Sequence, residues 1–378
     1  MPNHVTTMQT VPSSSTVRNE AQRAARSIAR PSFEWGVLMA AAAFEGGTYL
    51  DAWAHIHHLP ESFFTPWHGI IYASFGAAAL LLTVQWRAGR RRGASTWGAL
   101  PHGYGLSMMG VLMFFAAGLG DRGWHELLGI ENDIEALYSP PHLLLAVGGG
   151  LIATGPLRSA WKRTDDCLSG HWRAVISATL LLGLLTFFTS EMHPLVHPWA
   201  GQRFQPKLLE VTALGLPPHT EGGTTTTELA ETLGIESVML QTALLVALAL
   251  LLVRRWGPNL PLGWITCVLG VTTVGLSVFH GTLWSVPIAA AAGLVGDGLF
   301  RWLRPSTREP TRLRIFSTVL PVELFAIYFV GLAAMGGIWW SAHMWLGAIA
   351  LSGLTGWMLS YLVVPPQGPD RELNSEQA

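Results

Sequence analysis

The sequence predicts an all-α membrane protein, a polytopic bundle of about ten transmembrane helices. Half of its 378 residues are hydrophobic and only 12% are charged, whereas soluble domains carry roughly a quarter charged residues. The 17 tryptophans and 41 glycines fit the same class, because Trp gathers at membrane interfaces and Gly is frequent in membrane helices. The formal net charge of −1 gives no indication of a nucleic-acid partner.

A helix that crosses a bilayer needs about 20 mostly apolar residues. The apolar segments that meet this length are 34–53, 66–86, 98–119, 139–157, 173–192, 236–253, 261–280, 283–301, 315–334 and 338–363. The lipid bilayer is therefore the first partner that the sequence predicts, and the chain is expected to be an integral membrane protein.

Basic residues predict how these spans are oriented. If the N-terminus is cytoplasmic, all but three of the 23 Lys and Arg fall on the cytoplasmic side, and the exceptions are Arg122, Arg203 and Lys207. Positively charged residues gather on the cytoplasmic side of membrane proteins. We therefore expect both termini in the cytoplasm, with a bacterial inner membrane as the expected location.

The first motif lies in "DAWAHIHHLPESFFTPWHGIIYASF", where one apolar segment ends and the next begins. Asp51 and His55 are four residues apart, and on a helix this offset is about 40° of rotation and 6 Å of rise, so both side chains share one face. His68 follows in "FTPWH". There Thr65 is placed to cap a helix, Pro66 suits its first position, and His68 falls in its first turn.

The same pattern occurs a second time, in "LGDRGWHELLGIENDIEALYSPPHLLL". Asp121 and His125 are again four residues apart, and His142 follows in "YSPPH" after Ser139 and Pro140. A two-helix unit used twice in the same orientation is a parallel repeat. Each unit also has a tryptophan between its Asp and its first His, Trp53 in "DAWAH" and Trp124 in "DRGWH".

Two imidazoles and one carboxylate form a metal-ligand set that leaves coordination positions open. A histidine in the first turn of a helix lies at the positive end of the helix dipole, which disfavours imidazolium and favours the neutral ring that binds metal. A single histidine at a membrane boundary is more simply a helix cap in contact with water. The repetition favours one or two metal centres: Asp51, His55 and His68 form the first, and Asp121, His125 and His142 form a second or complete a shared one.

The first motif resembles the C subunit of the copper membrane monooxygenases, the particulate methane and ammonia monooxygenases. That family carries Asp-x3-His-x12-His, with the last His in a Phe-Thr-Pro-x-His segment, and Asp51, His55 and His68 keep this spacing. The family's second ligand set begins with Asn. Here Asp121 stands in that place, and the gap to His142 is longer.

The resemblance covers roughly residues 35–195. The chain thus resembles a distant relative of this family that carries additional C-terminal helices. It implies copper as the cofactor and oxidation of a small or lipophilic substrate by O2, with other membrane subunits or further copies of the chain as partners. Two alternatives stay open. Iron suits the same ligands, since two His and one carboxylate also serve non-haem Fe(II) oxygenases. A metal transporter or chaperone would need the ligands but no oxygenase activity.

Further candidate ligands lie at the same predicted membrane face. They are His57, His58, Glu191, His193 and His197. For His57 and His58 a solvent-facing role in a loop is the simpler interpretation, and for the other three a solvated helix end is equally compatible with the sequence. His280 and His343 also fall near this face, where packing is the simpler interpretation for each.

These observations together predict five parts of the chain. They are a disordered cytoplasmic tail, a metal-binding transmembrane bundle, an outer loop that is a candidate lid, a second transmembrane bundle and a cytoplasmic tail: 1–33, 34–193, 194–235, 236–364 and 365–378.

Overall fold

The computed structural model describes residues 28–60, 64–96, 98–129, 137–164, 167–204 and 226–366. Over these residues the chain is all-helical, and its only extended pairings are two isolated bridges. The all-α prediction is therefore confirmed for the described residues. Most of both predicted tails and residues 205–225 of the predicted lid lie outside them.

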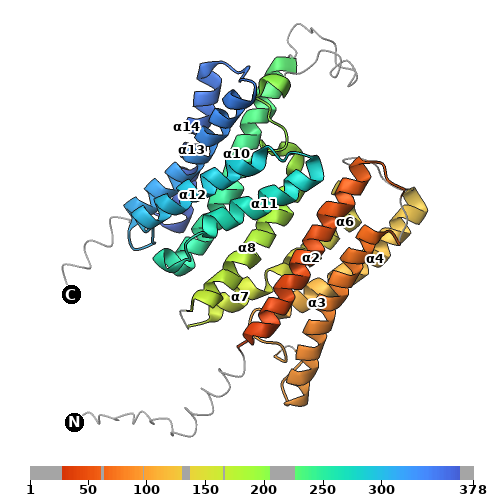
Figure 1. Cartoon of the computed structure of the whole chain (residues 1–378). Coiled ribbons are helices and arrows are strands. Elements are labelled where there is room, and N and C mark those ends of the chain that lie inside the picture. The colour runs from red at the N-terminus through yellow and green to blue at the C-terminus, as the bar shows by residue number, and fades with distance from the viewer. Residues whose placement is uncertain are drawn as a thin grey trace, which may run out of the picture.

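Long α-helices make up nearly all of this structure (Figure 1). The helices are α2 (Pro31–Ile56), α3 (Pro66–Arg91), α4 (Gly105–Leu128), α6 (Pro140–Ala153), α7 (Gly155–Lys162), α8 (Leu168–Phe188), α10 (Thr226–Trp256), α11 (Trp264–His280), α12 (Ser285–Leu303), α13 (Pro310–Met335) and α14 (Ala342–Val363). Short 3-10 turns lie at η1 (Ser190–Met192), η2 (Gln202–Phe204) and η3 (Gly257–Asn259).

Among the described residues, seven helices are long and apolar enough to cross a membrane, and they include α6 and α7 taken together as one span. This indicates an integral membrane protein. The predicted segment 261–280 corresponds to α11, which is apolar but shorter. Helices α2 and α4 have the length, but Glu45 and Asp51 in α2 and Asp121 and Arg122 in α4 lower their mean hydropathy. The count of ten spans stays a prediction.

Two helices differ in extent from the predicted spans. Helix α10 begins at Thr226, ten residues before the predicted span 236–253, because most residues of the segment "ELAETL" are strong helix formers that a search for apolar runs does not detect. The predicted span 139–157 is divided at Thr154 into α6 and α7, which together still form one candidate span. There Pro156 lacks a backbone N–H, and the Thr154 hydroxyl donates to the carbonyl of Gly150 at 2.5 Å.

The helices pack as neighbouring pairs, α2 with α3, α4 with α6, α11 with α12 and α13 with α14. Figure 1 shows α2, α3, α4 and α6 on one side of the molecule and α10 to α14 on the other, with α8 between them. The largest apolar core joins α7 and α8 to α10–α14, and a smaller one lies within α2, α3, α4 and α6. The division into two bundles stays a prediction.

Helices α4 and α6 come close because glycines face each other where they cross. A Cβ added at Gly110 would lie 2.6 Å from the carbonyl oxygen of Gly148, and one added at Gly148 would lie 2.9 Å from the carbonyl oxygen of Gly110. Small residues allow this approach between membrane helices. The crossing sets the spacing between the end of α4 and the start of α6, where the second motif lies.

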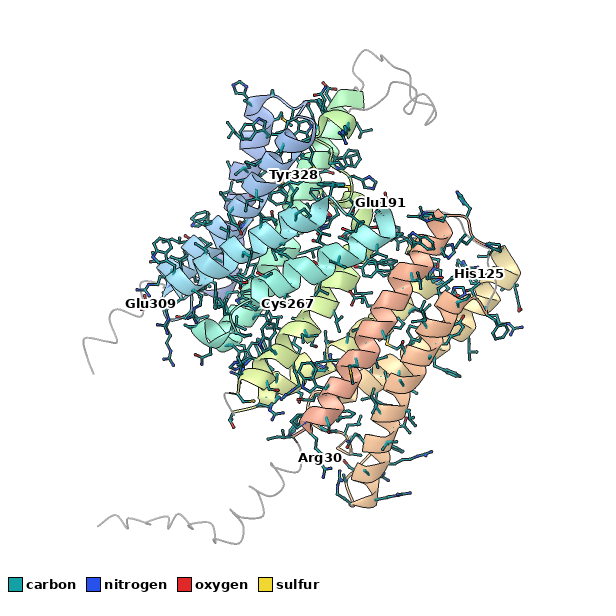
Figure 2. All side chains as sticks on the ribbon, in the orientation of Figure 1. Arg30, His125, Glu191, Cys267, Glu309 and Tyr328 are labelled. Atoms are coloured by element: carbon teal, nitrogen blue, oxygen red, sulfur yellow. The ribbon has the colours of Figure 1, made fainter. Side chains whose placement is uncertain are left out.

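The two ends of the bundle differ in chemistry. Helix α3 has His68 in its first turn and Arg90 and Arg91 in its last turn. Helix α10 has Arg254 and Arg255 in its last turn. Figure 2 shows Arg30 at one end of the molecule and His125 and Glu191 towards the other. We call these the basic end and the histidine end.

Candidate metal centres at the histidine end

The first set of predicted ligands meets where α2 ends and α3 begins. Asp51 and His55 lie on the last turns of α2, and His68 lies in the first turn of α3, directly after Pro66. Asp51 Oδ1 is 3.0 Å from His68 Nε2, and Asp51 Oδ2 is 3.9 Å from His55 Nε2. Thr65 precedes the helix in an extended conformation, and its hydroxyl lies 3.0 Å from His68 Nδ1.

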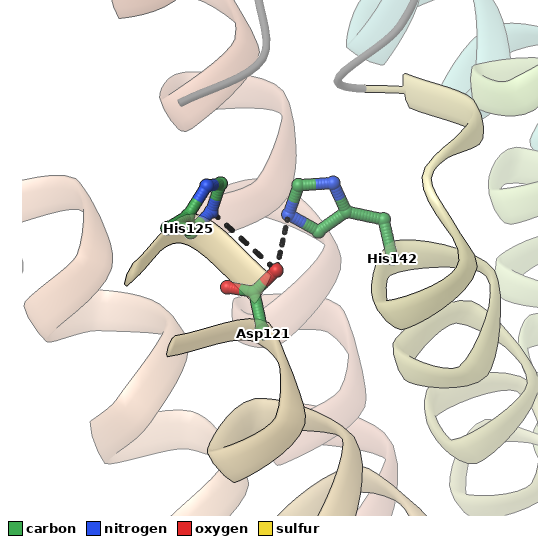
Figure 3. Close-up of side chains that lie close together, drawn as sticks. All are labelled: Asp121, His125 and His142. Atoms are coloured by element: carbon green, nitrogen blue, oxygen red, sulfur yellow. Dashed lines mark ion pairs between the residues drawn. The ribbon is translucent and has the colours of Figure 1, made fainter. Parts of the chain in front are cut away.

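The second set is built in the same way from α4 and α6 (Figure 3). Asp121 Oδ1 is 3.5 Å from His125 Nε2 and 3.4 Å from His142 Nε2. One ligand atom from each of these three residues lies within 4.8 Å of the other two. The hydroxyl of Ser139 lies 3.0 Å from His142 Nδ1, as Thr65 does for His68. The structure thus brings the three ligand atoms of the second set together, whereas in the first set each histidine lies near a different oxygen of Asp51 and the three ligand atoms do not all lie within 4.8 Å of one another.

Hydrogen bonds on Nδ1 leave Nε2 of these rings facing a carboxylate. His125 Nδ1 lies 3.3 Å from the carbonyl oxygen of Gly129, and a carbonyl only accepts, so Nδ1 carries the proton. In the neutral ring Nε2 then presents a lone pair to Asp121. Two acceptors in that arrangement repel each other unless a proton or a cation lies between them. Metal-binding histidines commonly have this second hydrogen bond on the other nitrogen.

The carboxylate of each set is enclosed by imidazoles. Asp51 Oδ1 and Asp121 Oδ1 are buried, and imidazole nitrogens lie at ion-pair distance from both. Among the described residues, no Lys or Arg forms an ion pair with either carboxylate. The residues present therefore fit a cation, because a cation would neutralise these carboxylates and bind the imidazole nitrogens.

Tyr72 of α3 lies beside the first set. The Tyr72 ring stacks on His68, with ring centroids 5.9 Å apart. Tyr72 is a site residue that the sequence analysis did not identify. Its only sequence signal is its position four residues after His68, one helical turn into α3.

His57 and His58 take structural positions at the end of α2. His57 Nδ1 lies 2.8 Å from the carbonyl oxygen of Trp53, and its ring packs on the Trp53 indole with centroids 4.3 Å apart. His58 adopts a left-handed backbone conformation, with φ of 49°. Both side chains are exposed. Both residues thus form part of the C-terminal end of α2.

Glu191, His193 and His197 lie beyond α8, in a segment made of η1 and the turns that follow it. Glu191 Oε2 is 3.0 Å from His197 Nε2, and this hydrogen bond lowers the pKa of the Glu191 carboxyl. Burial lowers the pKa of His193 to about 3, so this ring is neutral at physiological pH. His280, at the end of α11, joins Glu191 and His197 in a group whose ligand atoms lie within 4.8 Å of one another, as those of the second set do.

No family model matches the chain, and the comparisons with curated proteins and with solved structures likewise give no match.

Proposed function

We propose that this chain is a membrane-bound metal protein of the monooxygenase kind, which oxidises a small or lipophilic substrate with O2. The observation that carries the proposal is the second set, in which the ligand atoms of Asp121, His125 and His142 lie within 4.8 Å of one another. Copper is the proposed metal, because the first set keeps the Asp-x3-His-x12-His spacing of the copper membrane monooxygenases. Copper bound there would supply the redox chemistry that activates O2.

The chain's own residues would bind and orient the ion. Each aspartate supplies an anionic carboxylate beside two imidazoles. Thr65 and Ser139 fix the rings of His68 and His142 through Nδ1. Three protein ligands leave positions open for small molecules. This open coordination is what an oxygenase needs and what a closed structural site lacks.

Apolar surface around the second set supports a substrate that arrives from the bilayer. Leu127 and Leu128 at the end of α4 are 85% and 68% exposed, and Leu143 and Leu144 at the start of α6 are also exposed. Exposed apolar surface of this kind marks contact with lipid, a ligand or another protein chain. A second membrane subunit or another copy of this chain would cover the same surface.

The distribution of charge supports an orientation with both termini in the cytoplasm, in a bacterial inner membrane. Arg90, Arg91, Arg254 and Arg255 lie at the helix ends opposite the histidines, and basic residues favour the cytoplasmic side. The metal sets would then face the outer side. Reporter fusions at each terminus test this orientation, and an external reporter signal at either terminus contradicts it.

Metal analysis of protein purified without added metal is the first test. His142→Ala should lower the bound copper and abolish substrate-dependent O2 consumption. His102→Ala is the matched control, because His102 is exposed and precedes α4 at the opposite end from His125. Full copper occupancy in His142→Ala protein would contradict the assignment of this residue.

Two other functions make different predictions. Iron in place of copper is favoured by the ligand types, two His and one carboxylate in each set, and would be found directly by the same analysis. A metal transporter or chaperone would move metal into vesicles without consuming O2. Transporters hold their substrate near the middle of the membrane on broken helices, whereas these ligands lie at helix ends, so transport is the weaker candidate.

A further inference from the structure

A third cluster of ligand-type side chains lies at the histidine end, outside both Asp–His–His sets. Glu191 lies in η1, His197 follows in the next turns, and His280 is the last residue of α11. Glu191 Oε2 is 3.0 Å from His197 Nε2, and the His197 and His280 rings lie 5.9 Å apart at 69°. One ligand atom from each residue lies within 4.8 Å of the other two.

His280 has an unsatisfied nitrogen at this cluster. Its Nε2 is buried and has no hydrogen-bond partner among the described residues, although the ring packs on Phe279 with centroids 3.9 Å apart. Leaving such a group unpaired costs roughly 1–3 kcal/mol. A metal ion near Glu191 and His197 would satisfy this nitrogen.

Hydrogen bonds from α10 fix the segment that carries Glu191. The Gln241 side-chain amide donates to the hydroxyl of Thr189 at 3.1 Å and to the carbonyl of Met192 at 3.2 Å. Gln241 thus binds residues on either side of Glu191, so α10 fixes the position of Glu191.

His193 and Trp339 fix the part of the segment that carries His197. The carbonyl of His193 accepts from the backbone N–H of His197 at 2.9 Å, and the Trp339 indole donates to the carbonyl of Trp199 at 2.7 Å. His193 Nδ1 accepts from the N–H of Leu195 at 3.2 Å, which makes His193 a positioning residue and not a ligand. The cluster is thus built by contacts from several helices.

We propose that Glu191, His197 and His280 form a third binding site, for a divalent transition-metal ion. Two imidazole nitrogens and one carboxylate oxygen suit zinc, cobalt, copper or iron and leave an open position. Glu191 is partly exposed, so an ion reaches the site from the aqueous side. A bound ion ties the end of α11 to the connection between α8 and α10, and it therefore also stabilises the contact between the two halves.

Cobalt(II) is the probe that tests this site, because its visible spectrum reports its coordination. The full chain carrying His68→Ala and His142→Ala disables the other two sets and leaves only the third. In this background we expect saturable Co²⁺ binding with ligand-field absorption, and a higher unfolding temperature as Co²⁺ is added. Adding His280→Ala or Glu191→Gln should weaken binding at least about 10-fold. Glu191 is partly exposed, so Glu191→Gln tests the site without the packing change of His280→Ala.

His343→Ala is the matched control, because His343 is an exposed histidine at the start of α14. It should leave Co²⁺ binding in the background protein unchanged. The proposal is overturned if the background protein binds no Co²⁺, or if its binding persists unchanged in folded Glu191→Gln protein. Either result leaves the Asp–His–His sets to be judged by their own metal analysis.

Discussion

The charged side chains at the basic end and at the histidine end of the bundle have different partners. At the basic end, Arg158 donates to the carbonyl oxygens of Gly103 and Leu151 at 2.8 and 2.7 Å. The buried Glu34 lies 2.6 Å from Arg173 Nε in an ion pair. These charged groups have protein partners that hold them in place.

At the histidine end, buried polar atoms of three separate clusters lie beside imidazoles or a carboxylate, and no ion pair with Arg or Lys involves them among the described residues. They are Asp51 Oδ1, Asp121 Oδ1 and His280 Nε2. Each of these atoms lies beside further nitrogen or oxygen atoms of metal-ligand type. The Arg–Glu pair at the basic end maintains the fold, and the absence of such a partner at the histidine end agrees with the metal sites that we propose there.

The largest effect on stability is expected at the basic end, from Glu34→Ala. This change leaves Arg173, which is 1% exposed, without its carboxylate, and breaking a buried ion pair costs about 3–5 kcal/mol. Thermal unfolding in detergent measures the loss. The folded fraction should keep its metal, so a stable Glu34→Ala protein that has lost metal would contradict the division between the two ends.

Asp121→Ala should lower metal binding and leave the stability of the fold largely unchanged, the reverse of Glu34→Ala. The variant removes the oxygen that lies between His125 and His142, so we expect metal affinity at the second set to fall by more than about 100-fold, beyond the loss typical of an outer partner. Stability without metal should change little, because no Arg or Lys pairs with this carboxylate among the described residues. Competition with a chelator measures the affinity. Unchanged affinity would show that this set is not a metal site.

Ser139→Ala should lower metal affinity by an intermediate amount and leave stability unchanged. Ser139 orients His142 through Nδ1 but makes no side-chain cap on α6, so affinity should fall about 10- to 100-fold with little change in unfolding. Ser341→Ala is the control, because Ser341 does cap α14 by accepting from Met344 N. It should cost about 1 kcal/mol of stability and leave metal binding intact; the reverse pattern would refute both roles.

The smallest effect is expected from Arg122→Gln, beside the second set. Arg122 pairs with Glu126 at 3.0 Å, but both side chains are mostly exposed, and exposed pairs contribute little because water and salt screen them. Unfolding temperature and metal content should both match the unaltered protein. A clear loss of metal would mean that the charge of Arg122 also acts at the histidine end.

The sequence predicts those parts of the sites that depend on local geometry. Asp51 with His55 and Asp121 with His125 lie on single helices, so a spacing of four residues places them on one face. The Ser/Thr-Pro-x-His segments predict a histidine in the first turn of a helix, and the structure has this arrangement at both α3 and α6.

Features that depend on packing between distant segments were not predictable in this way. His280 meets Glu191 and His197 only because α11 ends beside the connection after α8, and no spacing in the sequence encodes that contact. Tyr72, by contrast, stacks on His68 one turn along the same helix, a local spacing that the search for metal ligands did not consider. The polar start of α10 and the break at Thr154 escaped a search based on apolar length alone.

The prolines that begin α3 and α6 have a consequence for how these sites acquire an ion. Pro66 and Pro140 fix the backbone φ of the residue that starts each helix, so His68 and His142 are preorganised without help from a ligand. Zinc fingers, by contrast, unfold when their metal is removed. If the proposed ions are bound here, a chelator should remove them while the helices stay folded. The rate of rebinding should then be limited by how quickly metal diffuses to the histidine end.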